Sequence, residues 1–456
     1  MKRRSTMSPK RYDIAIIGGG NAGFGVSQIA HPAGKSIAFI ESAEFGGTCP
    51  NRGCTPKKVL VAAAHALHEI EIAPTHGIEV GEPVLHWDKL IERKSSMIDF
   101  IPSAMRDTAA SRGDVYQGKA VFTGPNTLDV DGQTIEADNI VIATGSITRP
   151  LNIPGAEYLT TSDDVLSEPQ RPDTVVFVGG GVIAMEFSHV YSRAGASVTI
   201  LEAMPRLLPR LDHDAVDQLR AETERLGVEV KTSVEVLASE PEGDQLKVRY
   251  RIDGSEKSLV ADRVVNGTGR IANVADLNLD AGNVKYDGIR IDTDEFLRST
   301  SNPSVWVAGD ALVHSAQLSP LATYEGRTVG HNIVHGAEKV PDYSVIPSAV
   351  YTVPALASVG LTEQEAEARQ LDYDVQSSDM SGWFSARFYA ETAAWSKVLI
   401  DRKSRTVLGA HILGHHGEEL IHLFALAMRH NISVDELGGD IFAFPTFSAD
   451  LGSMVA

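Results

Sequence analysis

Cysteine is scarce in this chain, which has two in 456 residues. Both lie in one short segment, as Cys49 and Cys54, whereas two structural thiols would be expected to lie far apart. The four intervening residues include Gly53, so the chain can close into one helical turn that brings the sulfurs within bonding distance. An apolar run at 59–64 follows, and a helix N-terminus there would favour the thiolate of Cys54. The spacing predicts a redox-active dithiol; the alternative, half of a zinc site, lacks a second cysteine pair.

Positive charge is also in deficit, with 41 lysines and arginines against 60 acidic residues and a formal net charge of -19. This balance disfavours nucleic acids and anionic membrane surfaces, because phosphate binding needs concentrated Lys and Arg. Long apolar runs are missing as well, since none approaches the roughly 20 residues that cross a bilayer. We therefore expect no nucleic acid and no membrane among the partners.

Three basic residues follow Met1, but Ser, Thr, Met, Ser and Pro come next rather than an apolar segment, so no secretory signal is predicted. We expect a disordered lead-in, with Met1 and Met7 both candidate starts. A dithiol that must cycle between two redox states favours the reducing cytoplasm. The length exceeds what one hydrophobic core serves and predicts roughly two to four domains.

One pattern occurs twice along the chain. A strand-like run at 12–17 enters three consecutive glycines at 18–20, and a second run at 174–178 enters three more at 179–181. In each unit a helical stretch follows, and a second strand ends on an acid, Glu41 or Glu202, 23 residues after the first glycine. This strand–turn–helix–strand–acid order is typical of a dinucleotide-binding unit, and two complete copies are far more specific than one glycine motif.

Small residues in both units have mechanical roles: tight turns at Gly18 and Gly179, close approach to a pyrophosphate at Gly20 and Gly181, and helix packing at Gly23 and Ala184. The pyrophosphate would lie at the helix N-terminus, and the acids would accept hydrogen bonds from ribose hydroxyls. A carboxylate at Glu202 would repel the 2′-phosphate of NADPH and favours NADH, although Arg206 and Arg210 lie close enough to offset that repulsion.

Further motifs follow in a set order, at 46–58, 143–146, 267–273, 305–310, 318–322 and 358–363. With the two glycine turns, they make the chain similar to the pyridine nucleotide–disulfide oxidoreductases, which include dihydrolipoamide dehydrogenase, glutathione reductase and mercuric reductase. The resemblance covers nearly the whole chain. It implies an α/β fold of two Rossmann-like dinucleotide-binding domains and a C-terminal α+β dimerisation domain, hence a homodimer. The expected bounds are 1–150 and 274–340 for the FAD domain, 151–273 for the NAD(P) domain and 341–456 for the dimerisation domain.

The resemblance also implies the sites. FAD would be held by Gly18, Gly20, Gly23, Glu41, Thr48, Lys58, Gly118, Thr144, Gly145, Asp310 and Ser319, and NAD(P)H by Gly179, Gly181, Ala184, Glu202 and Gly269. Lys58 would pair with Glu186 beneath the flavin, where a cation stabilises the negative charge of reduction. Cys54 would face the flavin as its thiolate charge-transfer partner, and Cys49 would attack the substrate disulfide. Electrons would pass from NAD(P)H through FAD to the Cys49–Cys54 disulfide and on to a small disulfide.

The chain departs from this family near its C-terminus. Many members carry a His-Pro-Thr-x-x-Glu element, whose histidine protonates the leaving thiolate across the dimer; here Phe444 and Ala449 occupy the two positions. Such acid–base help is worth about 10² to 10⁴ in rate. Asp450, next to the glutamate position, either replaces that glutamate or is an ordinary surface residue. His415, His416 and His430 are other proton sources that the sequence leaves open.

The motifs that distinguish family members with particular substrates are also incomplete. Gln28 and Ile29 stand where glutathione reductases carry arginines, and no cysteine follows Cys54, whereas mercuric reductases have a C-terminal pair. Two further interpretations therefore stay open: a diaphorase or oxidase that passes flavin electrons to a quinone, metal ion or oxygen, and a non-catalytic redox sensor.

Overall fold

The computed structural model describes residues 10–312 and 316–456. The predicted lead-in and Met7 lie outside these described residues. The chain folds into two compact units: the first comprises residues up to 57, 93–149 and 270–342, and the second comprises 58–92, 150–269 and 343–456. Each is described by itself.

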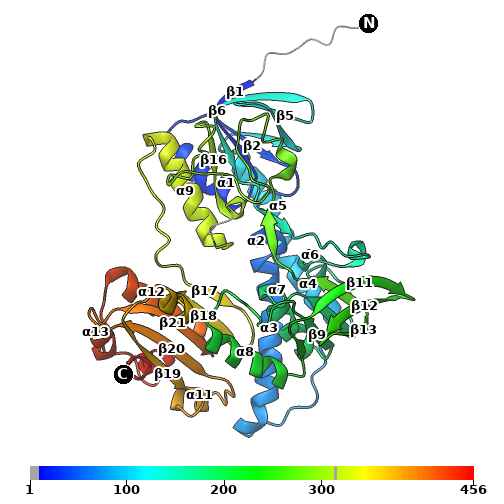
Figure 1. Cartoon of the computed structure of the whole chain (residues 1–456), viewed down its shortest axis with the longest axis vertical. Helices are drawn as coiled ribbons and strands as arrows, with labels where there is room; N and C mark the ends of the chain where they lie inside the picture. The colour runs from blue at the N-terminus through cyan, green and yellow to red at the C-terminus, as the bar shows by residue number, and fades with distance from the viewer. Residues whose placement is uncertain (1–9, 313–315) are drawn as a thin grey trace. The chain divides into compact units, whose positions relative to one another are not determined.

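The core of the first unit is a mixed sheet built on the first predicted glycine unit (Figure 1). Parallel pairing joins its strands in the order β3-β2-β1-β6, β16 pairs with β6, and the antiparallel strands β5 and β4 extend it. The bounds are β1 Lys10–Ile17, β2 Ile37–Glu41, β3 Asp114–Gln117, β4 Ala120–Gly124, β5 Thr127–Val130, β6 Gln133–Ile142 and β16 Val305–Val307. A two-stranded ribbon pairs β7 (Ser146–Thr148) with β15 (Arg270–Ala272). The predicted strands at 12–17 and 37–40 are confirmed.

Two helices of this unit, α1 (Asn21–Ala30) and α9 (Ser319–His335), pack tightly side by side (Figure 1). Glycines make the close approach feasible, because a Cβ at Gly326 would lie 2.1 Å from the carbonyl oxygen of Ala22, and one at Gly330 would lie 2.8 Å from that of Val26. The packing brings the first residues of both helices together: the Asn21 amide donates a hydrogen bond to the Ser319 hydroxyl. This contact positions Ser319 for the dithiol.

Other short elements complete the first unit: α2 Thr48–Arg52, α5 Ile101–Ala110, and 3-10 turns at Ala275–Leu277 and Gly309–Ala311. Two helices run across the boundary between the units, α3 Cys54–Ile72 and α4 Trp87–Ile98. The apolar run 59–64 therefore lies within α3, as predicted, and Cys54 is the first residue of that helix.

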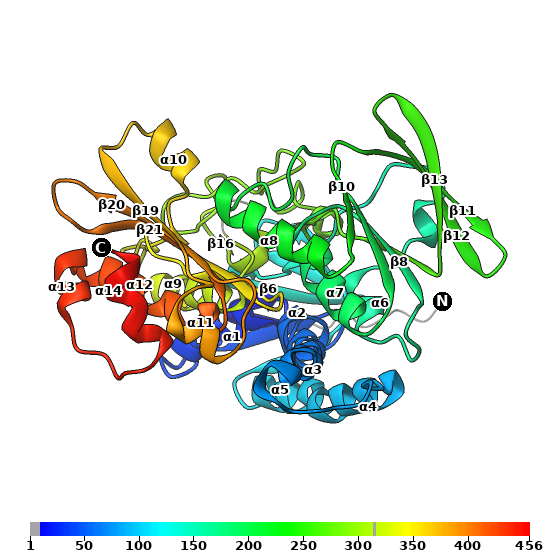
Figure 2. The same cartoon turned by 90° about the horizontal axis from the view of Figure 1, so that it is seen from below.

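The second predicted glycine unit forms a four-stranded parallel sheet, in the order β10-β9-β8-β14. Its elements are β8 Thr174–Val178, α7 Val182–Arg193, β9 Ser197–Leu201, α8 His213–Arg225, β10 Glu229–Lys231 and β14 Arg263–Asn266. An antiparallel ribbon, β11 (Glu235–Glu242), β12 (Gln245–Ile252) and β13 (Ser255–Ala261), lies beside it (Figure 2). Short helical turns at Ala73–His76 and Ala156–Tyr158, and α6 Ser162–Val165, belong to the same unit.

The C-terminal part of the second unit is a five-stranded antiparallel sheet, ordered β17-β18-β21-β20-β19, with α12 packed on β18 and β21. The strands are β17 Ser348–Val350, β18 Ala355–Gly360, β19 Tyr373–Asp379, β20 Trp395–Asp401 and β21 Val407–Gly414. The helices are α10 Glu363–Ala368, α11 Phe384–Phe388, α12 Gly417–His430, α13 Val434–Gly439 and α14 Leu451–Met454, with a 3-10 turn at Phe447–Asp450.

A charged cluster lies in the interior of this unit. Lys397 on β20 is fully buried, and its ammonium group lies 3.2 Å from Asp212, the buried N-cap residue of α8. Asp214, at 2.7 Å, and Glu363 complete the cluster. The Asp212 carboxylate also accepts hydrogen bonds from the N–H groups of Asp214 and Ala215. These contacts join the C-terminal sheet to helix α8.

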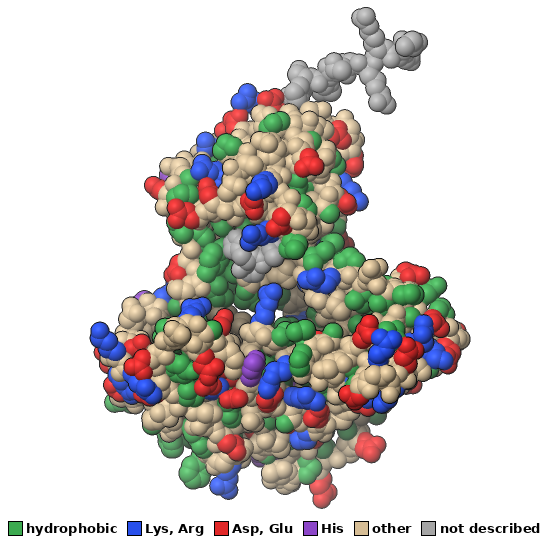
Figure 3. All heavy atoms as spheres, in the orientation of Figure 1, with side chains coloured by type: hydrophobic (Ala, Val, Ile, Leu, Met, Phe, Trp, Pro, Cys, Tyr) green, Lys and Arg blue, Asp and Glu red, His purple; other side chains and the backbone are tan. Residues whose placement is uncertain are grey.

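Acidic and basic side chains are interspersed over the face drawn in Figure 3. Among the described residues, no helix has the length and apolar character needed to cross a membrane.

Candidate active site

The first glycine turn has the geometry of a dinucleotide cradle. Gly18 has a φ of 117°, which favours glycine, and a Cβ there would lie 2.1 Å from the carbonyl oxygen of Ala143. At Gly23 a Cβ would lie 2.2 Å from the Gly18 carbonyl oxygen, so the absence of a side chain lets α1 pack on its own turn. A Cβ at Gly20 would instead meet nothing closer than 3.7 Å, which leaves the space open for a ligand.

Glu41 closes this turn from the end of β2. One carboxylate oxygen accepts a hydrogen bond from the N–H of Gly19 at 2.7 Å, and the other accepts one from Ala43 at 2.7 Å. The carboxylate is thereby held rigidly beside the start of α1, as the ribose-binding role requires.

Two observations test whether this cradle suits FAD. Helix α1 begins at Gly20 without a side-chain cap, so its first N–H groups are available to a pyrophosphate. Within the described part of the chain, the buried Thr144 hydroxyl has no hydrogen-bond partner, which is costly unless a ligand supplies one. The residues present therefore fit a bound dinucleotide.

Asp310 follows strand β16, at the carboxyl edge of the same sheet. Its carboxylate accepts a hydrogen bond from the Ser146 hydroxyl at 2.9 Å, and the Arg270 guanidinium donates to that hydroxyl at 2.9 Å. Burial raises the pKa of Asp310, against the opposing effects of Ser146 and Arg270. This small network fixes a half-buried carboxylate at the place where the resemblance expects a flavin contact.

The two cysteines are present as free thiols, and they interact. The Cys54 thiol donates a hydrogen bond to the Cys49 sulfur, which lowers the pKa of Cys49 to about 6 against the effect of burial. The Ser319 hydroxyl, the Cys54 N–H and the charge of Lys57 lower it further. The pKa of Cys54 is raised, by its hydrogen bond to Cys49 and by burial.

In the reduced pair these contacts favour a thiolate at Cys49, and the flavin-facing role expected of Cys54 stays a prediction. The N–H group at the start of α3 donates to the Cys49 sulfur, so this helix stabilises a thiolate at Cys49. Glycines shape the segment: Gly46 and Gly47 have φ values of 104° and 70°, and a Cβ at Gly47 would lie 2.9 Å from the Cα of Gly20. The dithiol loop therefore lies against the first glycine turn.

The lysine that acts on the dithiol is Lys57, which the sequence analysis did not single out. Lys58, which was expected to pair with Glu186, has its ammonium 3.5 Å from Glu418 and 4.0 Å from the centre of the Tyr351 ring. The buried Glu186 carboxylate accepts a hydrogen bond from the Tyr351 N–H at 2.9 Å. Tyr351 therefore contacts both Lys58 and Glu186, and the pairing of these two residues beneath the flavin stays a prediction.

The second glycine turn repeats the first. Gly179 has a φ of 103°, and a Cβ there would lie 2.6 Å from the Gly267 carbonyl oxygen. Helix α7 begins at Gly181 without a side-chain cap, and Ala184 is fully buried. Glu202 accepts hydrogen bonds from the N–H groups of Gly180 and, at 2.6 Å, Met204. This turn too fits a dinucleotide.

The remaining predicted site residues are three glycines and Thr48. Gly118, Gly145 and Gly269 all have positive φ values, of 156°, 69° and 102°. Thr48 is the first residue of α2, and the Gly118 N–H donates to the Glu41 carbonyl oxygen at 2.9 Å. Gln28, at the expected substrate-binding position on α1, accepts a hydrogen bond from Arg327 at 2.8 Å.

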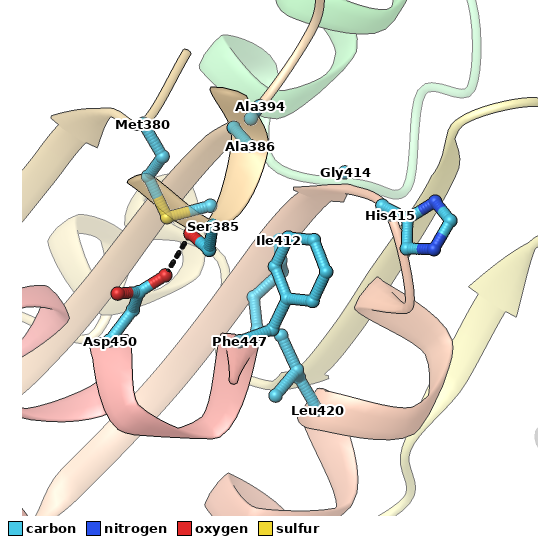
Figure 4. A pocket seen from close by; sticks show the side chains of 10 residues that line it. All are labelled: Met380, Ser385, Ala386, Ala394, Ile412, Gly414, His415, Leu420, Phe447 and Asp450. Carbon is cyan, nitrogen blue, oxygen red and sulfur yellow. Dashed lines mark hydrogen bonds between the residues drawn. The ribbon is translucent and has the colours of Figure 1, made fainter. Parts of the chain in front are cut away.

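The C-terminal segment shows no acid–base pair at the expected positions. Phe444 is 82% exposed. Asp450 is partly buried and accepts a hydrogen bond from Ser385 across a pocket that His415 and Phe447 also line (Figure 4). Burial raises the pKa of Asp450. Asp450 is thus engaged by Ser385 within its own chain.

His415, one of the proton sources that the sequence left open, has a carboxylate partner. Its Nδ1 lies 2.9 Å from Glu391, which also lies 3.2 Å from Nε2 of the buried His68. Although burial opposes ionisation, the hydrogen bonds from His415 and His68 lower the pKa of Glu391 to about 2. The positions of His68, Glu391 and His415 in the sequence do not predict this cluster.

Comparison with known proteins identifies the family of this chain. Residues 12–326 match the model of the pyridine nucleotide-disulphide oxidoreductase family, and residues 346–455 match the dimerisation domain of that family. The chain belongs to this family. Its members are FAD- and NAD(P)-dependent, and the second match supports a homodimer.

Family members with different substrates are about equally similar to the chain. A dihydrolipoyl dehydrogenase of Thermus scotoductus is 32% identical over 97% of this chain and 96% of that protein. A glutathione reductase of Burkholderia cepacia is 29% identical over 96% of this chain and 97% of that protein. The HOCl-induced flavoprotein disulfide reductase RclA from Escherichia coli has a similar structure, with a TM-score of 0.86, 26% identity and coverage of 97% of this chain and 99% of that chain.

The fold, the two cradles and these matches agree on the class of enzyme. The chain is an α/β flavoprotein and an FAD-dependent NAD(P)H disulfide oxidoreductase. The near-equal identities to a dihydrolipoyl dehydrogenase and a glutathione reductase leave the substrate to be argued from the site.

Proposed function

We propose that this homodimeric enzyme reduces a small-molecule disulfide with NADH, in the cytoplasm, through the Cys49–Cys54 pair. The observation that supports it most is the lowered pKa of Cys49, about 6, beside a Cys54 that keeps its proton. At neutral pH such a pair has one ready nucleophile, the Cys49 thiolate.

FAD is held at Gly18, Gly20, Glu41, Thr144 and Asp310 and, when bound, supplies the two-electron relay between the hydride donor and the active-site disulfide. NADH is held at the second turn, with Glu202 on its ribose. The Glu202 carboxylate disfavours a 2′-phosphate, and the nearby Arg206 already forms an ion pair with Asp217 at 2.6 Å. The site therefore favours NADH over NADPH.

Thiol–disulfide exchange at the dithiol proceeds in two steps. The Cys49 thiolate attacks one sulfur of the substrate disulfide, forming a mixed disulfide and releasing the first thiolate, which takes up a proton. Cys54 then gives up its proton and attacks the Cys49 sulfur, which restores the Cys49–Cys54 bond and releases the second thiolate, and this thiolate also takes up a proton. The net reaction consumes NADH, one proton and the disulfide, and yields NAD⁺ and two thiols.

Phe444 shapes the choice of substrate. With no histidine at this position, the departing thiolate must take its proton from the solvent or from the substrate itself. A disulfide whose thiols have a low pKa needs this help least, because a thiolate of lower pKa leaves faster. We therefore propose a disulfide of low thiol pKa, such as an aromatic or otherwise activated one.

The experiment follows NADH consumption with two disulfides of contrasting thiol pKa, oxidised glutathione and a nitroaromatic disulfide. Wild type should reduce the activated disulfide at least about 100-fold faster than glutathione disulfide, and Cys49→Ser should reduce neither. Equal rates in wild type and Cys49→Ser would overturn the proposal.

A second candidate, direct transfer from the flavin to a metal ion, is favoured by one comparison. A Cu(II) complex of RclA from Escherichia coli has a TM-score of 0.87 to this chain at 25% identity. A metal ion needs no protonated leaving group, so Phe444 would not hinder it. Cu(II)-dependent NADH oxidation that persists in Cys49→Ser would support this second function.

A further inference from the structure

Helix α3 and the loop after β21 bring together three side chains that the dinucleotide and dithiol sites do not use. They are His65, Glu69 and His415, and their ligand atoms all lie within 4.8 Å of one another. His65 and Glu69 are four residues apart on α3 and share one face of the helix, with Nδ1 of His65 3.6 Å from the carboxylate. Both are partly exposed, whereas His415 is buried.

The ring of His415 is held in a defined orientation. A carboxylate accepts hydrogen bonds and cannot donate them when ionised, so Nδ1 of His415 carries the proton directed at Glu391. Nε2 is then the ring nitrogen left to bind a metal ion. The ring also stacks with Tyr389 and Phe447, at centroid distances of 4.8 and 5.3 Å. A carboxylate behind a histidine is the arrangement that orients metal-binding imidazoles and raises their basicity.

The donor set indicates which ligand would bind. Two imidazole nitrogens and one carboxylate oxygen suit a divalent cation of the zinc class, with water in the remaining position. Ligand atoms around zinc lie about 3.3 Å apart, given bond lengths of about 2.0–2.2 Å. The half-exposed His65 and Glu69 side chains have the rotational freedom to close the difference, while the buried His415 provides the fixed ligand.

We propose that His65, Glu69 and His415 form a binding site for a divalent zinc-class cation, with Glu391 as the residue that positions His415. The site is separate from the flavin and nicotinamide cradles in its residues. Because its ligands come from α3 and from the loop before α12, a bound cation would cross-link two segments that are about 350 residues apart in sequence.

The test is isothermal titration of the full-length, FAD-loaded protein with Zn²⁺ alone, after chelator treatment and desalting. The protein is kept with its Cys49–Cys54 disulfide formed, so that the free dithiol cannot itself ligate zinc. Wild type should bind about one Zn²⁺ per chain. His65→Gln and Glu69→Gln should each weaken binding at least about 10-fold, and Glu391→Gln about 10- to 100-fold.

His76→Gln is the matched control, because His76 is an exposed histidine shortly after α3 and should leave the affinity unchanged. Absence of zinc binding by the oxidised wild type would overturn the proposal. So would an unchanged affinity in both His65→Gln and Glu69→Gln, whose half-exposed positions make unfolding an unsuitable explanation for any loss. The melting temperature of each variant is also measured, and we expect it to match that of the His76→Gln control.

Discussion

The Ser319 hydroxyl donates a hydrogen bond to the sulfur of Cys49. Ser319 opens helix α9, and its oxygen accepts a hydrogen bond from Asn21, the first residue of α1. The two helices that pack across the first cradle therefore also set the reactivity of the dithiol.

Replacing Ser319 by alanine should raise the pKa of Cys49 above its value of about 6, because one of the hydrogen bonds that stabilise the thiolate is lost. In the reduced protein, alkylation of Cys49 by iodoacetamide between pH 6 and 7 should slow several-fold. Peptide mass spectrometry distinguishes Cys49 from Cys54. Thr323→Ala, which removes another hydroxyl in the first turns of α9, serves as the control. An unchanged pH profile would show that Ser319 does not tune the pair.

Replacing Glu202 by alanine should shift the coenzyme preference toward NADPH. The carboxylate is held by the N–H groups of Gly180 and Met204, where it would repel a 2′-phosphate. We expect the ratio of kcat/KM for NADPH over that for NADH to rise at least about 10-fold, mainly through a lower KM for NADPH. Initial-rate kinetics with both coenzymes measure it, with Glu229→Ala on the neighbouring strand as the control. A ratio that stays constant would contradict the assignment of Glu202.

Acid should destabilise the second unit through His189. This histidine is fully buried, which lowers its pKa to about 3, and it hydrogen-bonds Thr223 at 2.9 Å. The unfolded chain binds a proton near pH 6.5 while the folded chain does not. Stability is therefore present above pH 6.5 and lost as pH falls, by about 1.4 kcal/mol per pH unit.

The apparent melting temperature, followed from pH 7 to pH 5, should thus fall less steeply in His189→Gln than in wild type, although the variant is less stable at pH 7. The exposed His76→Gln should follow the wild-type slope. Parallel slopes in all three proteins would exclude His189 as the acid-sensitive group.

Replacing Lys397 by methionine should destabilise the second unit by about 3–5 kcal/mol, because it leaves the buried Asp212 carboxylate without its ammonium partner. Adding Asp212→Asn should restore part of the loss, since asparagine removes the unpaired charge and can still cap α8. Thermal melts of the two variants measure the difference. Lys403→Met, at an exposed turn, is the control. A double variant no more stable than Lys397→Met would contradict this account of the cluster.

Local patterns explain what could be predicted from the sequence. Gly18 and Gly179 mark turns whose backbone angles exclude most side chains, and Cys49 and Cys54 are close in the chain, so each could be recognised in one short segment. The parallel strands and the apolar stretch of α3 likewise depend on neighbouring residues.

Contacts between distant segments were not predictable in this way. The pair of Asn21 and Ser319 joins residues about 300 positions apart, and the buried Lys397 resembles an exposed lysine in sequence. The lowered pKa of Cys49 was not predictable either, because it depends in part on a hydroxyl from another helix.

The most direct test of the account is an anaerobic reductive titration of the FAD-loaded enzyme, comparing wild type with Cys54→Ser. A dithiol relay holds two electrons in the Cys49–Cys54 disulfide and two in the flavin. We predict that wild type takes up four electrons per chain and passes through a state with a long-wavelength band from the thiolate beside the flavin. Cys54→Ser should take up two electrons without that band. Uptake of two electrons by wild type, with flavin bleaching identical to that of Cys54→Ser, would contradict the central claim that the dithiol carries the electrons.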